Sequence, residues 1–500
     1  MMTVAVAIGP FIEMMDLLVA NVALRHIAGS LSIGTHEAAY VITAYMVSNA
    51  IVLPITGWIG ARMGYKRYFM WSVAIFTIAS VGVAASQTLR QIVGFAIIQG
   101  LAGGALQPLS QTLLVRNYPR ARLGLAMSIW AMTMVTAPAL GPFVGGWIAD
   151  SWNWRWIFLI NLPFGLLCLI MVSSFVPKEP VQLRNGSERF DYVGLVLLVL
   201  AVGSLQFVLD RGEYENWLAS PLIASLVIVS IVGAIGLVIW ELGSRHPLLD
   251  LSVFKLRSFT LGTAVLGLGY GVFFCGVVLT PLWLQSMLGY TATWAGLALM
   301  PTGTIVVILL LVVGRVMPLV DLRWLICSGL ILMAFSFFYF SRAAPNASLH
   351  YVLVGRAFFG VAMALFFAPI STAILSGLDP ARVGAGAGIS GLFRNLSASI
   401  GTAVGITLWD SESQRAQSVL AEHTSVYSPH WQSFIEELAR LTYAKPDIFL
   451  VGPAFELAQQ ELLLQARTTA LTHIFEMAAV LCLGVAILSL AIGPIKIRRG

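Results

Sequence analysis

Residues 96–124 read AIIQGLAGGALQPLSQTLLVRNYPRARLG, and residues 356–384 read RAFFGVAMALFFAPISTAILSGLDPARVG. The two stretches align with Pro108 on Pro369, and the offset stays at 260 or 261 through the polar loop that follows. Chance similarity between apolar segments is common, but a register held through a polar loop is not. The pattern therefore predicts two copies of one structural unit within the chain.

The composition excludes a water-facing surface. Of 500 residues, 58% are hydrophobic and only 10% are charged, whereas a soluble domain carries roughly 25% charged residues. A soluble enzyme, a nucleic-acid binder and a disordered protein are excluded. The formal net charge of +6 is interpreted as a feature of membrane topology.

Fourteen stretches are long and apolar enough to span a membrane, and they lack the period-two alternation of barrel strands. They cover residues 3–24, 37–57, 68–86, 91–114, 123–150, 154–176, 191–210, 218–241, 259–280, 294–314, 324–341, 351–376, 384–408 and 472–494. The repeat offset covers an even number of spans, so both copies keep the same orientation. We therefore expect an all-α integral membrane protein with a parallel repeat of two six-helix bundles.

The domain boundaries follow from this repeat. Residues 1–176 form the expected N-terminal six-helix bundle, and residues 259–500 form the C-terminal one. Residues 177–258 are interpreted as a charged linker followed by an inserted two-helix hairpin, which gives a 6 + 2 + 6 arrangement.

The placement of Lys and Arg predicts the orientation. With the N-terminus inside, the inside loops hold many more Lys and Arg residues than the short outside loops. Both termini are therefore expected to be cytoplasmic. No cleavable signal peptide is recognised at the first span. Residues 409–471 then form one long segment outside, which we call the periplasmic segment.

The first span carries two carboxyl residues, Glu13 and Asp16. Carboxyl groups in an apolar span are energetically expensive and indicate function. The spacing of three residues predicts that both lie on one helical face. A buried carboxyl beside a like charge can bind and release a proton near neutral pH, so both residues are candidate proton-coupling groups, although Glu13 alternatively only lines a hydrated cavity.

Other charged residues fall in or near spans. Arg394 lies in mid-span and needs an acidic partner or water, with Asp16 and Glu13 as the best candidates. Arg356 lies near the outer end of its span, where it either snorkels to the interface or functions. His473 is interpreted as a hydrated helix end, and Asp210 as solvated.

One segment between two expected spans has the composition of a tight turn. The loop at 57–67 contains Gly57, Arg62, Gly64, Lys66 and Arg67. Its glycines allow a tight turn, and its cations can hold a neighbouring helix end. The alternative is a plain positive-inside loop.

The fifth span contains Pro138, Gly141, Pro142, Gly145 and Gly146. Prolines bend a helix, and small residues four apart let another helix approach closely. A kinked, close seam suits a gate that seals one side of a cavity, and an ordinary packing helix is the alternative.

These segments together resemble the fourteen-span drug:proton antiporters of the major facilitator superfamily, in the EmrB/QacA-type branch. The loop at 57–67 resembles the family's cytoplasmic loop motif, with Ala61 where an Asp is usual, and the glycines and prolines of the fifth span resemble its antiporter motif. Asp16 with Asn21 resembles the first-span motif, and Asn21 is expected to brace another helix. Gln99 and Gly100 resemble the end of the fourth-span motif, whose usual Arg is replaced here.

The resemblance implies a major-facilitator fold and proton-coupled efflux of lipophilic drugs or a metabolite across the bacterial inner membrane. It also implies a periplasmic adaptor and an outer-membrane channel as partners. The periplasmic segment fits adaptor docking, since residues 431–441 and 455–471 show helical apolar spacing. A self-packed cap on the bundle is the alternative.

Other functions remain as rivals. A dedicated siderophore or metabolite exporter, or less favourably a proton symporter for uptake, would use the same fold. An enzyme is not expected, because no clustered His, Asp or Cys occurs, and no nucleotide-binding loop is found. No cofactor, metal or nucleic acid is predicted. A soft apolar wall for the substrate is expected from Met14, Met15, Trp130, Met134 and Phe393.

Overall fold

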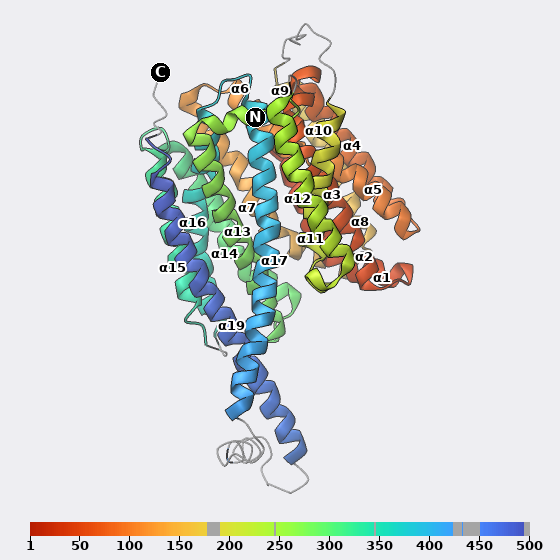
Figure 1. The fold of residues 1–500 in the computed structure, drawn as a ribbon, viewed down its shortest axis with the longest axis vertical. Helices are drawn as coiled ribbons and strands as arrows, with labels where there is room; N and C mark the ends of the chain where they lie inside the picture. Colours follow the sequence, from red (N-terminus) through yellow and green to blue (C-terminus); the bar gives the residue numbers. More distant parts are fainter. Residues whose placement is uncertain (178–190, 245–246, 345–346, 424–432, 434–450, 495–500) are drawn as a thin grey trace.

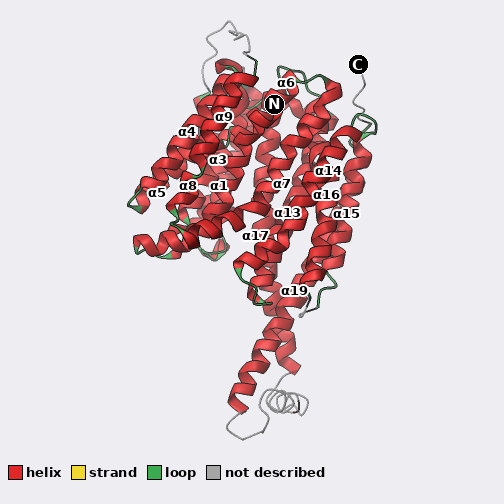
Figure 2. Cartoon of the chain, turned by 180° about the vertical axis from the view of Figure 1, so that it is seen from behind, coloured by secondary structure: helices red, strands yellow, loops and turns green. Residues whose placement is uncertain are grey.

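The described part of the chain is built from helices, most of them joined by short loops. The computed structural model describes residues 1–177, 191–244, 247–344, 347–423, 433 and 451–494, and no strand occurs among these residues. Figures 1 and 2 show the helices standing side by side as one elongated bundle. The prediction of an all-helical protein is confirmed.

The first part of the chain supplies nine helices. They are α1 (Met2–Leu31), α2 (Thr35–Ala38), α3 (Tyr40–Met63), α4 (Tyr65–Ala85), α5 (Leu89–Gly103), α6 (Leu106–Asn117), α7 (Arg120–Ser151), α8 (Arg155–Leu159) and α9 (Asn161–Phe175). The expected fourth span is thus two helices, because the chain breaks between α5 and α6, and the sixth span is α8 followed by α9.

The remaining described helices fall in the segment expected to hold the inserted hairpin and in the expected C-terminal bundle, here called the hairpin and the second part. The hairpin comprises α10 (Tyr192–Leu198), the π-helix η1 (Val199–Gly203), α11 (Ser204–Arg211), the short 3₁₀-helix η2 (Trp217–Ala219) and α12 (Pro221–Gly243). A second 3₁₀-helix, η3 (Leu251–Lys255), leads into α13 (Arg257–Ser286), α14 (Ala292–Val316), α15 (Leu322–Phe340), α16 (Leu349–Ser376), α17 (Val383–His423) and α19 (Val451–Leu490).

Twelve helical stretches of the described chain are long and apolar enough to cross a membrane. The expected spans at 123–150 and 384–408, which correspond to α7 and α17, are not among these twelve, and the stretch of α7 that was assessed is Arg122–Ala137. These two helices are equivalent in the sequence repeat and pack against protein on several sides. The number of spans therefore stays a prediction.

The two parts meet along two matching seams. Helix α3 packs against α17, and α14 packs against α7. A Cβ atom at Gly57 of α3 would lie 2.5 Å from the backbone nitrogen of Ala385, and one at Gly314 of α14 would lie 2.9 Å from the Cα of Leu125. Both seams therefore bring backbones together, and both lie at the end of the bundle where α1 begins and α19 ends (Figure 1).

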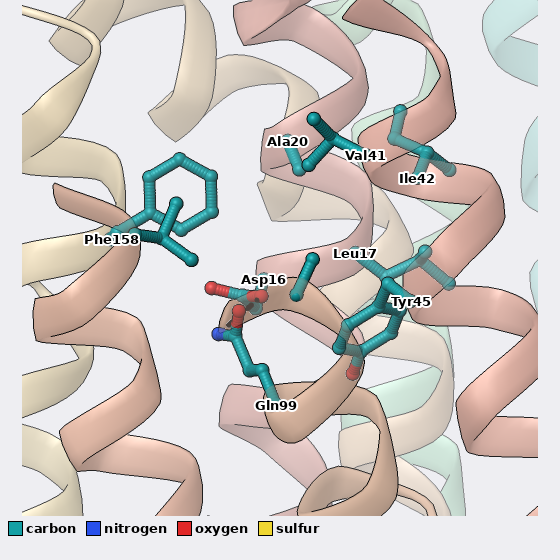
Figure 3. Close-up of a pocket in the computed structure, with 10 residues that line it drawn as sticks. Asp16, Leu17, Ala20, Val41, Ile42, Tyr45, Gln99 and Phe158 are labelled. Atoms are coloured by element: carbon teal, nitrogen blue, oxygen red, sulfur yellow. Dashed lines mark hydrogen bonds between the residues drawn. The ribbon is translucent and has the colours of Figure 1, made fainter. Parts of the chain in front are cut away.

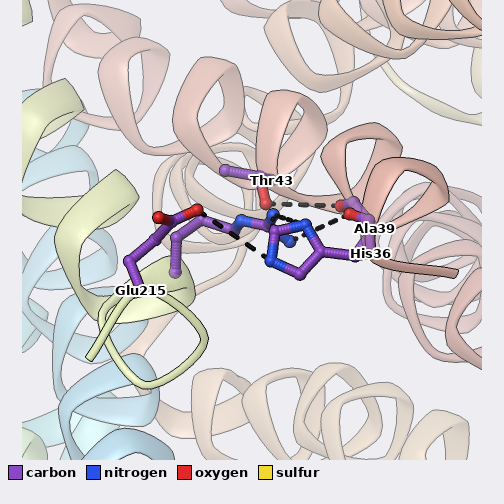
Figure 4. A network of polar contacts seen from close by, with 5 residues as sticks. His36, Ala39, Thr43 and Glu215 are labelled. Carbon is purple, nitrogen blue, oxygen red and sulfur yellow. Dashed lines mark hydrogen bonds and ion pairs between the residues drawn. The ribbon is translucent and has the colours of Figure 1, made fainter. Parts of the chain in front are cut away.

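The hairpin contacts both parts at their opposite end. Gln206 of α11 donates a 2.9 Å hydrogen bond to Ser399 of α17, and Asp210 accepts one from Thr43 of α3. His36 lies 3.9 Å from Glu215 (Figure 4). Asp210, expected to be solvated, is half-buried and bonded to the hydroxyl of Thr43, so it is only partly open to solvent.

Helices α17 and α19 continue beyond the bundle. With 41 residues, α17 is about 60 Å long, and Figures 1 and 2 show it leaving the bundle beside α19. The indole of Trp409 donates a 3.0 Å hydrogen bond to the carbonyl of Arg467, which ties the two helices together. The expected helical spacing of residues 455–471 is confirmed, and residues 431–441, apart from residue 433, lie outside the described residues.

One contact of the hairpin makes stability depend on pH. Glu213 follows α11, and its carboxyl group hydrogen-bonds Asp410 of α17. Burial, and secondly this like-charged neighbour, raise the pKa of Glu213 from 4.5 to about 7. The folded protein therefore holds a proton that the unfolded chain releases above pH 4.5, and stability falls as pH rises across that window.

Substitution of Glu213 by glutamine is expected to flatten this dependence. A glutamine at this position cannot ionise, so the melting temperature at about pH 8 should exceed that of the wild type, and the two proteins should converge at about pH 5. The measurement is thermal unfolding in detergent over this pH range. The matched control is Glu215→Gln in the same turn, and equal pH profiles for the wild type and Glu213→Gln would contradict the prediction.

Candidate functional site

The two carboxyl residues of α1 lie inside the protein. Glu13 is 3% exposed and Asp16 is 4% exposed. Helix α1 is surrounded by α7, α9 and α6, so both side chains point into protein and not into lipid. A charge in this setting needs hydrogen-bond donors or a cation to remain ionised.

Asp16 is held by amides of its own half. One carboxylate oxygen accepts a 2.8 Å hydrogen bond from Gln99 of α5, and the other accepts one from Asn161 of α9. Both amides also reach the hydroxyl of Ser80 on α4, at 3.2 and 2.8 Å. No cation pairs with Asp16 among the described residues, so the carboxylate charge is met by dipoles alone.

A small cavity opens beside Asp16. Its volume is about 10 Å³, close to the space that one water molecule needs. Figure 3 shows the Gln99 amide turned toward Asp16, with Tyr45 and Phe158 on either side. The remaining lining residues are apolar, namely Leu17, Ala20, Val41, Ile42, Val83 and Ala96. A single water or proton can be placed here, but not a drug-sized molecule.

Glu13 belongs to a second cluster that joins the two halves. Its oxygens accept hydrogen bonds from Asn49 of α3 at 2.9 Å and from Gln107 of α6 at 2.6 Å. The side-chain amide oxygen of Gln107 in turn accepts a hydrogen bond from the guanidinium of Arg394 of α17. Asn395 of α17 also donates to Asn49 at 3.4 Å, so four helices converge on one carboxyl group.

The expectation of a shared face is therefore only roughly met. Residues three apart on a helix differ by about 60° in direction, and this is enough to give Glu13 and Asp16 different partners. Arg394 does face Glu13, but it bonds the amide of Gln107 between them. The guanidinium and the Glu13 carboxyl are still close enough for their charges to interact.

The glycines of α7 press against α1 beside Asp16. A Cβ atom at Gly141 would lie 2.9 Å from the Cβ of Leu18, and one at Gly145 would lie 3.2 Å from the Cα of Val19. Gly146 is half-buried in the same helix. The side chains of Pro138, Pro142 and Asn21 lie outside the described residues, so their expected roles stay predictions.

The fourth-span motif sets the break between α5 and α6. A Cβ at Gly100 would collide with the backbone carbonyl of Tyr45, and one at Gly104 would lie 2.5 Å from the carbonyl oxygen of Asn49. The absence of side chains lets α3 approach the break closely. This approach brings Gln107, at the start of α6, onto Glu13.

Four of the five residues expected to line a substrate cavity are buried, and their contacts are with neighbouring helices. Met14, Met15, Trp130 and Met134 are at most 7% exposed, whereas Phe393 is 42% exposed. The Trp130 ring stacks on Phe367 at 5.9 Å, and the Arg394 guanidinium lies 5.6 Å from the Trp130 ring. The ring of Phe393 contacts the ring of Phe254 of η3 at 5.9 Å.

The segment at 57–67, expected as a loop, is the end of α3 and the start of α4, joined by a tight turn at Gly64. It also holds the end of another helix. Gly64 has a φ of +85°, a value that favours glycine. The ammonium of Lys66 donates to the carbonyls of Ser173 and Val176 at the end of α9, while Arg62 lies 3.8 Å from the ring of Trp58. Arg67 is exposed.

Two further expectations have definite outcomes. Arg356 is 1% exposed and donates a 2.8 Å hydrogen bond to the carbonyl of Gly276, so it does not snorkel. His473 is exposed and lies 3.9 Å from Glu412, but it stands in the interior of α19 and not at a helix end. Among the described residues no group of three or more His, Cys, Asp and Glu could hold a metal ion.

The site contains residues that the sequence pattern did not single out. Asn49 and Gln107 hold Glu13, and Asn161 and Ser80 complete the Asp16 cluster. The available signal was an amide side chain inside an apolar span, which is a feature of helix-to-helix hydrogen bonding.

Comparison with known proteins agrees with this architecture. The Major Facilitator Superfamily model matches residues 6–402. The chain is 39% identical over 441 residues to the multidrug export protein EmrB of Escherichia coli, which covers 88% of this chain and 86% of that protein. It is 38% identical over 427 residues to the fatty acid resistance protein FarB of Neisseria gonorrhoeae, with 85% and 84% covered.

A solved structure shows the same fold at low identity. The proton:xylose symporter XylE, bound to 6-bromo-6-deoxy-D-glucose, superposes with a TM-score of 0.58 at 14% identity, over 96% of this chain and 94% of that chain. The helical architecture, the family match and the exporter relatives agree. The chain is a multi-pass membrane transporter related to EmrB-type multidrug exporters, and it belongs to the Major Facilitator Superfamily.

Proposed function

We propose that this transporter exports amphipathic small molecules in exchange for protons, with Asp16 and Glu13 as the proton-binding groups and Arg394 as their cationic partner. The observation that carries the proposal is the pair of buried carboxyl groups on α1, one of which has no cation beside it in the described part of the chain. Such groups within a membrane span are proton-relay candidates.

Alternating access is proposed as the transport mechanism. The α3–α17 and α7–α14 seams bring backbones together at one end of the bundle. Opening these seams and closing the opposite end would expose the clusters of Glu13 and Asp16 to each side in turn. The proposed topology has fourteen spans in the 6 + 2 + 6 arrangement with both termini cytoplasmic, so the seams close the cytoplasmic end.

The substrate class rests on the apolar residues between the two halves. Trp130 of α7 stacks on Phe367 of α16, and Phe367 stacks on Tyr270 of α13 at 5.5 Å. Separating the halves would free these ring faces beside the charges of Glu13 and Arg394. Amphipathic molecules fit such a surface, and the relatives named for multidrug export and fatty acid resistance support this. A dedicated metabolite or siderophore exporter, or less favourably a proton symporter for uptake, is the alternative.

The proposed partners are a periplasmic adaptor and an outer-membrane channel. The described ends of α17 and α19 project together from the bundle (Figure 1). A helical pair of this kind offers a surface that does not face lipid, and we propose it as the adaptor contact. The inner membrane of a bacterium is the location that this assembly requires.

Proton release from liposomes tests the function. Purified protein is reconstituted with a pH-sensitive dye in the lumen, a pH gradient is imposed, and drugs and metabolites are added one at a time. Substrate-dependent proton movement, absent from empty liposomes, is the expected result. Substrate movement without any proton movement would rule out antiport and leave the transporter fold.

A further inference from the structure

A three-residue chain connects a proton-binding candidate in one half to a buried cation in the other. Gln107 donates from its amide nitrogen to Glu13 at 2.6 Å, and its amide oxygen accepts from Arg394. Gln107 is 7% exposed and Arg394 is 3% exposed. The amide is therefore oriented by a carboxylate on one side and a guanidinium on the other.

The electrostatic surroundings make this connection sensitive to charge. The titratable and charged groups that act on Glu13 are Asp16 of the same helix, Tyr45 of α3, Tyr270 of α13 and Arg394 of α17. Within the described part of the chain, Arg394 is the one cation in this group. Its counter-charge across Gln107 is the ionised Glu13.

We propose that Gln107 is the positioning residue that transmits the protonation state of Glu13 to α17, and so couples proton binding to the contact between the two halves. This inference rests on the proposed proton-coupled function. Asn49 and Asn395 reinforce the same contact with a neutral hydrogen bond.

The direction of coupling follows from the charges. While Glu13 is ionised, hydrogen bonds along the chain are charge-assisted at both ends and hold α6 to α17. When Glu13 binds a proton, the carboxylate charge is lost and Arg394 keeps an uncompensated charge in the protein interior. A buried unpaired charge strongly disfavours the arrangement that contains it, so protonation favours movement of α17 away from α6.

The Asp16 cluster has no comparable connection to the second half of the chain among the described residues. Its partners on α4, α5 and α9 all belong to the first half of the chain. Protonation of Asp16 changes hydrogen bonds inside that half and leaves the contact with α17 as it was. The two carboxyl groups are therefore inferred to act differently, because only the protonation of Glu13 changes the contact with the second half.

The test measures the distance between the halves as a function of pH. Spin labels are attached at Arg90→Cys and His350→Cys, which are exposed and stand at equivalent positions of the repeat. The four native cysteines are buried, so labels react at the introduced sites. In liposomes, the wild-type distance distribution is expected to shift to shorter values as pH falls.

Gln107→Leu is the decisive variant. It keeps a buried side chain of similar size but removes both hydrogen bonds, so the pH-dependent distance shift should disappear. Substrate-coupled proton flux should fall about tenfold, the scale of one charge-assisted hydrogen bond. The matched control is Gln111→Leu, one turn along α6, whose side chain has no hydrogen bond to Glu13 or Arg394 in the described residues.

An exchange variant separates coupling from folding. In Glu13→Gln with Gln107→Glu, the carboxyl group moves next to Arg394 and the chain of three groups is kept. The pH-dependent shift should return in this variant, while it stays absent in Glu13→Gln alone. A merely structural role of Gln107 would not restore a pH response by this exchange.

The outcomes distinguish this inference from the proposed function. If Gln107→Leu shows the same proton flux and the same pH-dependent distance shift as the wild type, the role of Gln107 is overturned and antiport stays intact. Failure of the exchange variant to recover, when its melting temperature matches the wild type, would also overturn it. Absence of proton flux and distance shift in the wild type itself would overturn antiport and this inference together.

Discussion

Replacing Asp16 by asparagine is expected to abolish substrate-driven proton movement, lowering it about 100-fold or more, the scale of losing one essential proton-transfer group. Asparagine keeps the size of the side chain, and its oxygen can still accept from one of the two amides, Gln99 or Asn161. Its NH2 group can donate to the other once that amide is turned to present its oxygen, so the cluster can stay packed. Asparagine cannot take up a proton. The measurement is dye-reported proton flux in liposomes with an imposed pH gradient.

The control for this variant is the same substitution at a carboxyl group outside the cluster. Asp191 precedes α10, accepts a 2.8 Å hydrogen bond from the backbone of Gly194 and bonds the indole of Trp240. An asparagine there can still accept, so Asp191→Asn should transport as the wild type does. Full proton flux in Asp16→Asn would move the coupling site to Glu13 or elsewhere.

The membrane class and the repeat could be read from the sequence because both depend on local pattern. Hydropathy marked helices at each of the expected spans, and the paired glycines recur in matching contacts. Gly145 meets Val19 of α1, while a Cβ at the equivalent Gly405 would lie 2.7 Å from the sulfur of Cys275 on α13. Small residues at repeated positions thus predicted close helix pairs in both halves.

The partners of the carboxyl groups could not be predicted, because they come from distant parts of the chain. Arg394 and Gln107 are 287 residues apart, and nothing in the spacing selects an amide over a direct carboxylate pair. The sequence does show which spans contain amide side chains, but it does not show which neighbouring helix each amide faces. Only the break between α5 and α6 turns Gln107 toward Glu13.

Polarity along the chain did not predict where the helix of the thirteenth expected span ends. The expected thirteenth span stops at residue 408, yet α17 continues to His423. Residues such as Glu412, Gln414 and Arg415 are good helix formers. They end the apolar face without ending the helix, so a segment expected to be a connector begins as an extension of α17.

Filling the contact between α7 and α1 should also impair transport, although less than removing the carboxyl group does. In Gly145→Leu the new Cβ would lie 2.8 Å from a methyl carbon of Val19 and 3.2 Å from its Cα. The backbone of α1 must move, because a side chain rotation cannot relieve contact with a Cα atom. Overpacking of this kind destabilises proteins by about 1–3 kcal/mol.

The displacement acts on the site because Val19 follows Asp16 by less than one turn. The Gln99–Asp16 hydrogen bond is 2.8 Å long, and a shift of about 1 Å takes it beyond hydrogen-bond length. Substrate export and proton flux are expected to fall about tenfold, the effect of about 1.4 kcal/mol of lost positioning. Both are measured in liposomes, with thermal unfolding in detergent to record the loss of stability.

Gly94→Leu provides the matched control, because a Cβ at Gly94 of α5 meets nothing within 4 Å. The same side chain added there should leave transport at the wild-type level. Gly145→Ala should fall between the two, since its single carbon meets Val19 without a longer chain behind it. Equal transport by Gly145→Leu and Gly94→Leu would show that the α1–α7 contact tolerates separation, and the glycines would then be packing residues with no part in holding Asp16 at its partners.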